Sequence, residues 1–230
     1  AACLAIKKAY DDGDKDKAAA LSKILYAQSE LIAGVEKPDS GRLILDGTDI
    51  TDMDITSRAK LGVAYAFQQP VRFKGLTVRD LLELSAGKKL SVGELCGLLA
   101  KVGLCAEEYI DREMSAALSG GEAKRIEIAT VLARGAKLSV FDEPEAGIDL
   151  WSFAKLVETF EDIRSSTSGS LVIISHQERI LSIADEIVVV ADGKIRTSGK
   201  RDDILPLLLR GEFSGRCPAA APQKNGGACR

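Results

Sequence analysis

The stretch "LSGGEAKRIEIATVLARGAKLSVFDEPEAGID", residues 118–149, places a helix, a strand and two adjacent carboxylates close together in the chain. Its first part predicts a helix over roughly 121–134. The apolar run 138–141 then predicts a short buried strand, which ends in Asp142 and Glu143. Such a strand end is typical of a nucleotide site, where one carboxylate supports magnesium and the next acts on an attacking water.

The surrounding segments alternate between predicted helices and strands. Helices are expected at 15–33, 149–164 and 201–209, strands at 61–67, 171–175 and 186–191, a strand with an Asp-Gly turn within 41–50, and a mostly helical region at 76–118. Alternating β and α elements predict an α/β fold with an open sheet covered by helices. The region 76–118 is expected to form a small α-helical subdomain.

Composition excludes several classes of function. The hydrophobic fraction is 46%, the charged fraction 28% and the net charge −3, as in an ordinary globular protein. This charge predicts no nucleic-acid partner and no anionic-membrane surface. The longest apolar runs are too short to span a bilayer and no signal peptide is evident, so the expected compartment is the cytoplasm.

The cysteines do not form a recognisable framework. There are 5, an odd number without close spacing, which argues against a set of disulfides. Cys217 and Cys229 lie in the segment 213–230, whose Pro, Gly and Ala content predicts a disordered tail. Their role is left open by the sequence.

Four segments occur in one order with familiar intervals. They are "AFQQP" (66–70), "LSGGEAKRIEIATVLARG" (118–135), "LSVFDEPEAGID" (138–149) and "VIISHQE" (172–178). Together they resemble the ATP-binding cassette (ABC) ATPases, from about Gly34 to about Leu209. Taken singly, a carboxylate pair after a strand, an "SGG" turn or a lone histidine is usually structural, but their joint occurrence favours this family. The resemblance implies ATP hydrolysis with Mg²⁺ and an ABC-like, mostly parallel sheet.

The resemblance assigns one group of residues to a partner's nucleotide. Ser119, Gly120 and Gly121 open a helix, so their free amides and the positive helix end suit a phosphate. In the family this signature faces the γ-phosphate of ATP bound mainly to a second protomer. A homodimer or heterodimer of cassettes is therefore implied.

The resemblance assigns a second group to the chain's own nucleotide. Asp142 matches the carboxylate that supports magnesium, and Gln68 matches a glutamine that reaches the magnesium and water. Glu143 matches the general base, and His176, the only histidine, matches the switch histidine at the γ-phosphate. Asp149 matches an aspartate at the dimer interface, although "EAGID" departs from the commoner "SALD".

The phosphate-binding loop of the family, G-x-x-x-x-G-K-[ST], is not found. The segment that follows it in the family is present as "LIAGVEKPDSG" (31–41), and the family's interval places the loop lysine near Leu25. No glycine lies between Gly13 and Gly34, and a helix there would hide its amides in its own hydrogen bonds. Lys23 alone is no phosphate cradle.

This absence predicts an unusual N-terminal region. Residues 1–30 are expected to form an atypical helical segment in place of the loop, without the β alternation of the family's N-terminal region. Residues 31–212 are expected to form the ABC-like domain. Whether residues 1–30 are native or reflect a truncation is left open, and hydrolysis by the isolated chain is expected to be weak or undetectable.

Three functions remain open. The first is ATP hydrolysis for iron–sulfur cluster assembly, because the segments "AFQQP" and "SHQERIL" resemble the ATPase of the Suf system, which acts on a soluble scaffold. The second is the nucleotide-binding subunit of an ABC transporter, with a separate membrane subunit. The third is a non-hydrolysing, partner-dependent cassette whose signature completes a partner's site.

Overall fold

A computed structural model describes residues 2–7, 29–115, 117–166, 169–191 and 194–210 of the chain. The helices are α2 (Ser29–Ala33), α3 (Ile55–Leu61), α4 (Val78–Ala86), α5 (Val92–Lys101), α6 (Ala106–Tyr109), α7 (Gly120–Arg134), α8 (Leu150–Ser166), α9 (Glu178–Ser182) and α10 (Arg201–Leu209). The strands are β1 (Ala2–Lys7), β2 (Ile44–Leu45), β3 (Thr48–Asp49), β4 (Val63–Ala66), β5 (Leu138–Asp142), β6 (Ser170–Ser175), β7 (Glu186–Ala191) and β8 (Lys194–Lys200).

The main sheet has the strand order β4-β5-β6-β1-β7-β8. Strands β4, β5 and β6 are parallel, with Phe141 paired with Ala66 on one side and Ile173 on the other. Strand β1 runs antiparallel to both β6 and β7. The carboxyl ends of β4, β5 and β6 therefore meet at one edge of the sheet, where Gln68, Glu143 and His176 follow their strands closely.

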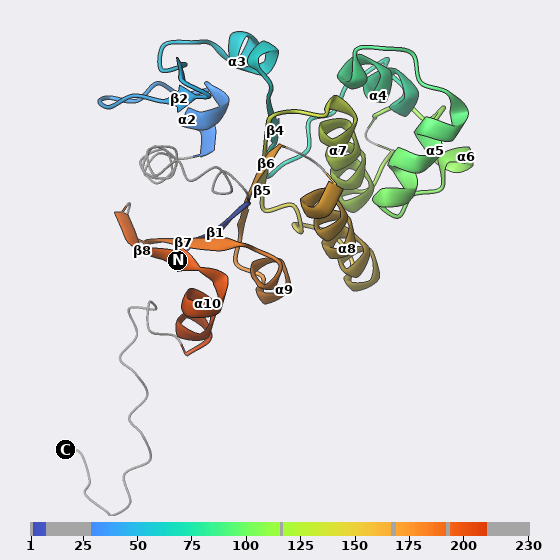
Figure 1. The fold of residues 1–230 in the computed structure, drawn as a ribbon. Helices are drawn as coiled ribbons and strands as arrows, with labels where there is room; N and C mark the ends of the chain where they lie inside the picture. The colour runs from blue at the N-terminus through green and yellow to red at the C-terminus, as the bar shows by residue number, and fades with distance from the viewer. Residues whose placement is uncertain (1, 8–28, 116, 167–168, 192–193, 211–230) are drawn as a thin grey trace, which may run out of the picture.

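Both faces of this sheet are covered, as expected for parallel strands. Figure 1 shows α7 and α8 on one side, and α2 with the β2–β3 hairpin on the other. The larger core includes Phe141 and Ile173 on the helical side, whereas Val140 and Val172 join Ile32 in the smaller core. Alternate residues of one strand thus serve opposite cores.

Most of the predicted elements are confirmed. The Asp-Gly turn joins β2 to β3, and Asp46 and Gly47 both have positive φ, 47° and 78°. Helix α7 ends at Gly135, whose φ of 60° is the left-handed cap that glycine favours. Helices α4, α5 and α6 fall within the predicted helical region 76–118.

The prediction for the N-terminal segment is wrong for residues 2–7. These residues form β1, an inner strand of the sheet, and not part of a helical segment. The strand is fixed by pairing with β6 and β7, which local sequence patterns do not report. Most of the helix predicted at 15–33 lies outside the described residues, and its last part is observed as α2.

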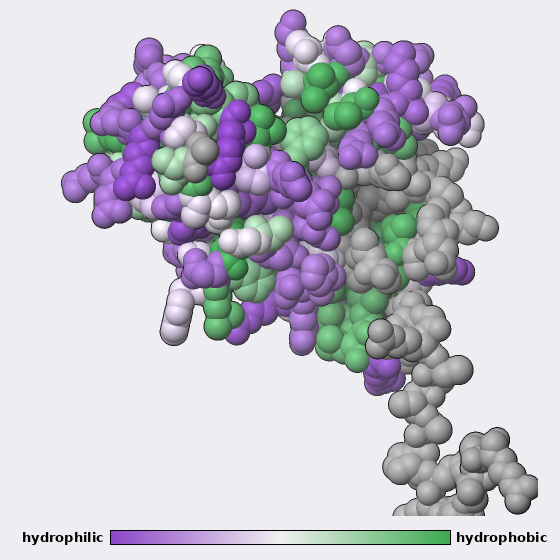
Figure 2. Space-filling model, turned by 180° about the vertical axis from the view of Figure 1, so that it is seen from behind, coloured by the Kyte–Doolittle hydropathy of each residue, from purple (hydrophilic) through white to green (hydrophobic). Residues whose placement is uncertain are grey.

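Apolar character is spread unevenly over the surface. Figure 2 shows the reverse face, where hydrophilic side chains dominate and hydrophobic ones lie in smaller groups between them. Within the described ranges, no helix combines the length and apolar character needed to cross a membrane.

A buried arginine joins α2 to α3. Arg58 is 1% exposed, and its Nη2 and Nε donate to the carbonyl oxygens of Thr51 and Met53, at 2.9 Å each. Its Nη1 donates to the carbonyls of Leu31 and Ile32 at the end of α2. The guanidinium is thus satisfied by backbone acceptors, including those that a helix C-terminus leaves unpaired. Burial lowers the pKa of Arg58.

We expect Arg58→Met to lower the free energy of unfolding by about 2–4 kcal/mol, because several buried carbonyls lose their donor. Urea denaturation measures this change. Arg79→Met is the matched control, since Arg79 pairs with the well-exposed Asp111 at 3.3 Å. That control should cost at most about 1 kcal/mol. Equal losses in the two variants would contradict the structural role given to Arg58.

Candidate functional site

The residues that follow β4, β5 and β6 converge at one edge of the sheet. Gln68 Nε2 donates a hydrogen bond to Glu143 Oε2 at 2.6 Å, although 75 residues separate them in the chain. His176 Nδ1 lies 4.0 Å from Glu143 Oε1. The side chain of His176 is 62% exposed and that of Glu143 is 32% exposed, so both are accessible to a ligand. The structure therefore brings these three predicted residues together.

The two carboxylates at the end of β5 have different surroundings. Asp142 Oδ2 accepts a hydrogen bond from the Tyr65 hydroxyl at 3.1 Å. Glu143 has a φ of 43°, a left-handed conformation that is uncommon for a residue other than glycine. Its amide donates to the Ile174 carbonyl at 2.9 Å, which holds this turn against β6. Strained backbone of this kind is concentrated at functional sites.

The predicted signature residues begin α7. Ser119 is the N-cap: its Oγ accepts from the Glu122 amide at 3.2 Å, and Glu122 Oε2 accepts from the Ser119 amide at 2.7 Å. Hydrogen bonds from Tyr109 and then from Ser119 lower the pKa of Glu122 to about 2. The start of α7 thus carries a negative charge at neutral pH, and the Ser119 amide, expected to be free for a phosphate, is bonded to this carboxylate instead.

The two signature glycines have different surroundings. A Cβ added to Gly121 would lie 2.8 Å from the carbonyl oxygen of Gly147, whereas a Cβ on Gly120 would meet nothing within 4 Å. Gly121 therefore lets the start of α7 pack against the backbone between Glu143 and Asp149. Gly120 is open to the surface, which makes it the better position for substitution.

Asp149 has a structural contact of its own. Its Oδ1 accepts from the amides of Trp151 and Ser152, at 3.1 and 3.0 Å, so it caps the start of α8. The hydrogen bonds from Ser152 lower the pKa of Asp149. The described structure does not place Asp149 in contact with Glu143 or His176, and its predicted interface role stays a prediction.

Lys124 and Glu127 were missed by sequence reasoning. Both lie on α7, and the Lys124 side chain is 0% exposed although it carries a charge. Lys124 lies four and seven residues before the buried Ile128 and Val131, so it shares their face of the helix. A lysine on an apolar helix face was the sequence signal that could have identified it. Tyr65 was also missed, because its partner Asp142 is distant in the sequence.

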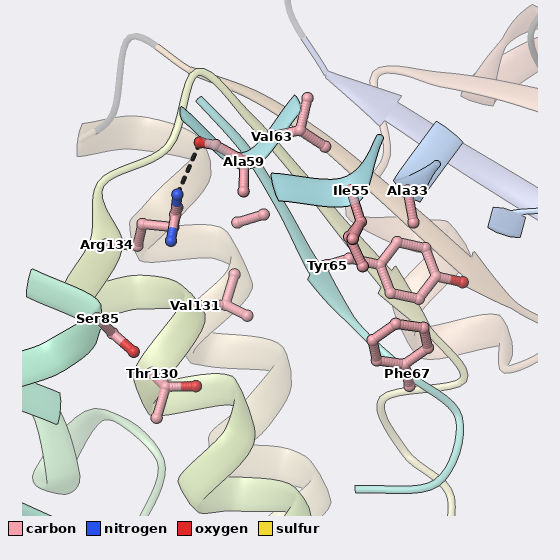
Figure 3. A pocket seen from close by; sticks show the side chains of 11 residues that line it. Ala33, Ile55, Ala59, Val63, Tyr65, Phe67, Ser85, Thr130, Val131 and Arg134 are labelled. Atoms are coloured by element: carbon pink, nitrogen blue, oxygen red, sulfur yellow. Dashed lines mark hydrogen bonds between the residues drawn. The ribbon is translucent and has the colours of Figure 1, made fainter. Parts of the chain in front are cut away.

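A cavity lies on the same side of the molecule as Tyr65 and Phe67, separate from the group of Gln68, Glu143 and His176. Its volume is about 220 Å³, and it is lined by residues of α2, α3, β4, α4 and α7 and by Phe67, which follows β4. Figure 3 shows Tyr65 and Phe67 along one side and Arg134 at the other, where Arg134 Nη2 donates to the Ala59 carbonyl at 2.6 Å. This volume is below the roughly 300–1,000 Å³ that small-molecule sites usually have. Gln68, Glu143 and His176 do not line the cavity, so it is distinct from the polar edge at Glu143.

The polar edge can be tested for its fit to magnesium and ATP. Asp142 and Gln68 offer carboxylate and amide oxygens, the ligand type that Mg²⁺ prefers. No group of three or more His, Cys, Asp or Glu side chains that could hold a metal occurs among the described residues. Mg²⁺ usually takes one or two carboxylates together with waters and substrate phosphates, so Asp142 would be its carboxylate here. The family's interval places the phosphate loop around Leu25, and this part of the chain lies outside the described residues.

Fold and site together define the class of this protein as an α/β ATPase domain of the cassette type. The chain belongs to the ABC transporter family, whose model matches residues 29–146. Members of this family are ATP-hydrolysing enzymes, and ABC ATPases generally use ATP with Mg²⁺.

Named relatives cover most of the chain. An uncharacterized ABC transporter ATP-binding protein of Methanocaldococcus jannaschii is 34% identical, over 81% of this chain and 76% of its own length. A lipopolysaccharide export system ATP-binding protein of Haemophilus influenzae is 30% identical, over 76% and 74%. A molybdenum import ATP-binding protein of Rhizobium etli is 31% identical, over 86% of this chain but only 54% of its own length.

Solved structures confirm the fold. An ATP-binding cassette described as a dimer in a post-hydrolysis state, bound to ADP and Pi, has a TM-score of 0.66 at 19% identity, covering 80% of this chain and 82% of its own. The ATP-binding subunit of an ABC transporter has a TM-score of 0.65 at 23% identity, covering 84% and 78%. The predicted α/β, ABC-like fold is thus confirmed. The expected mostly parallel sheet is limited to a parallel core of β4, β5 and β6, because β1, β7 and β8 pair antiparallel.

These comparisons favour one of the open functions. The relatives are named as ATP-binding proteins of transporters, and the names above do not mention iron–sulfur assembly. The finer resemblance to the Suf ATPase is therefore not supported, and the transporter alternative fits better.

Proposed function

We propose that this chain is a cytoplasmic ATP-binding subunit of an ABC transporter, which works in a pair of cassettes and drives a conformational change in a separate membrane subunit. The names of its relatives support this assignment. The observation that carries the catalytic part is the convergence of Gln68 and His176 on Glu143, at 2.6 and 4.0 Å.

In this proposal each residue at the edge has a separate task. Glu143 accepts a proton from, or polarises, the attacking water, and Gln68 orients that water. Asp142, held by the Tyr65 hydroxyl, supports magnesium through water. His176 donates a hydrogen bond to the terminal phosphate. Bound Mg²⁺ would neutralise the developing phosphate charge.

The start of α7 serves the second cassette. Ser119 and Gly120 are exposed, and the start of a helix carries a partial positive charge. Glu122 orders this end through the capping box, which prepares it for a phosphate presented by a partner. In the proposal Asp149 lies at the interface with the second cassette, and the close approach of Gly121 to Gly147 brings the start of α7 near the segment that precedes it.

A second candidate function is that the chain lends only its signature to a partner. The sequence contains no G-x-x-x-x-G-K-[ST] segment, so the amides that would hold the chain's own phosphates are not evident. Under this candidate the chain does not hydrolyse ATP by itself. It still completes the site of a cassette that has the loop.

The transporter assignment is tested by recovering the tagged full chain from membrane and soluble fractions of its native cells. We expect it in detergent-solubilised membranes, together with a protein of several membrane spans, and we expect His176→Ala to lower the ATP hydrolysis of that complex. Lys155→Met, at a half-exposed surface lysine, is the control and should leave hydrolysis unchanged. Recovery only with a soluble scaffold would contradict the transporter assignment and favour iron–sulfur assembly.

A further inference from the structure

A buried ammonium group lies behind the polar edge. Lys124 Nζ donates to the carbonyl oxygens of Phe67 and Gln68, the latter at 3.3 Å, and to that of Asp142 at 3.4 Å. Glu127 Oε2 lies 3.3 Å from Nζ and forms an ion pair with it, although this oxygen accepts no hydrogen bond. An ammonium has three N–H donors, so the three carbonyl oxygens can use all of them without water. The charge is therefore fully engaged inside the protein.

Glu127 binds the other backbone polar group of Phe67, in the preceding peptide unit. Its Oε1 accepts from the Phe67 amide at 3.2 Å, while Lys124 takes the Phe67 carbonyl. The Glu127 side chain is 11% exposed. Burial raises the pKa of Glu127 and the charge of Lys124 opposes this rise. Two side chains from one turn of α7 thus bind the backbone N–H and the backbone C=O of Phe67.

Stability alone is a weak explanation for this pair. Replacing a buried ion pair with apolar side chains of similar size is often neutral or even stabilising. The pair connects α7, which begins after Ser119, with two other segments. One is the loop after β4, which contains Gln68, and the other is the end of β5, where Asp142 and Glu143 lie.

We propose that Lys124 and Glu127 are positioning residues that lock the start of the Gln68 loop and the end of β5 onto the helix that begins at Ser119. A displacement of α7 by a partner at Ser119 is then passed to Gln68 and Glu143 through backbone groups. The inference rests on the proposed function only for the catalytic roles of Gln68 and Glu143.

The test uses the full chain without nucleotide. Lys124→Met leaves the Glu127 carboxylate buried without its positive partner, so this variant should unfold at a lower urea concentration than wild type. The double variant Lys124→Met/Glu127→Leu should unfold at the wild-type concentration or above. In this double variant we expect the Gln68 side-chain amide and the Glu143 backbone amide to exchange with solvent about tenfold faster, the equivalent of one lost hydrogen bond.

One further comparison controls for the loss of a surface ion pair. Lys155→Met is a matched control, because Lys155 and Glu158 form an ion pair with the same spacing at 3.0 Å on the surface. It should leave the exchange of Gln68 and Glu143 unchanged. If the double variant is stable and both amides exchange within twofold of wild type, the pair is only structural and the proposal is wrong. Since nucleotide is absent, failure of the ATPase assignment would not produce that outcome.

Discussion

A chimaera in which a strand and G-x-x-x-x-G-K-[ST] loop of a family member replace residues 1–28 should hydrolyse ATP at least about 100-fold faster than the chain itself. Removing even one preorganised donor to developing charge costs about 10²–10³ in turnover. Restoring a whole set of phosphate-binding amides should have no smaller effect. Turnover of Mg-ATP at saturating nucleotide measures the gain.

The physical reason lies in the direction of β1. Lys7, at the carboxyl end of β1, pairs with Leu171 near the amino end of β6, while Cys3 pairs with Ser175 at the other end. The chain therefore leaves β1 at the edge opposite to Glu143. A strand in the same position but parallel to β6 would deliver its loop to the Glu143 edge.

The matched control is Glu143→Gln in the chimaera. Because Glu143 is assigned as the general base, this change should lower turnover by about 10²–10⁴-fold and leave the affinity for Mg-ATP nearly unchanged. A chimaera that binds Mg-ATP tightly but turns it over no faster than the chain would show that the edge at Glu143 is not catalytic. Turnover that survives Glu143→Gln would assign the base elsewhere.

The elements that sequence predicted well are those with local signals. Helix α7 has a marked start and a glycine at its end, and β5 is an apolar run of strand length, so each follows from its own residues. Strand β1 has no comparable signal. It is a strand because β6 and β7 flank it, and such long-range pairing cannot be read from six residues.

The site shows the same division. The motifs predicted Gln68, Glu143 and His176 as a group, and the order of the parallel strands explains why they meet. The residues that hold this group were not predicted. Lys124 bonds mainly to backbone carbonyls, which every residue has, so no pairing of side-chain types in the sequence identifies its partners.

Gly120→Asp should abolish the ability of this chain to activate a partner cassette. The chimaera with Gly120→Asp has a phosphate loop but a damaged signature, and we expect it to be about 100-fold less active than the chimaera alone. Adding the unmodified chain, which has the signature but not the loop, should restore up to half of the turnover per dimer. In the mixed dimer one composite site has both parts.

The substitution is chosen so that its effect is electrostatic. A Cβ added at Gly120 meets no atom within 4 Å, and an acidic residue in the first turn of a helix is usually stabilising by about 0.3–1 kcal/mol. The fold of α7 should therefore survive, as thermal unfolding can verify. What changes is that a second carboxylate joins Glu122 at a helix end that must accept a phosphate.

The decisive comparison is between two additions to the same damaged chimaera. The unmodified chain should restore turnover, and the chain with Gly120→Asp should not, although both can form the same dimer. Recovery with both would mean that dimerisation alone activates the chimaera and that Ser119 and Gly120 do not contact nucleotide. Recovery with the unmodified chain alone would show that its signature acts on a partner's ATP, because it then supplies the one part that the damaged chimaera lacks.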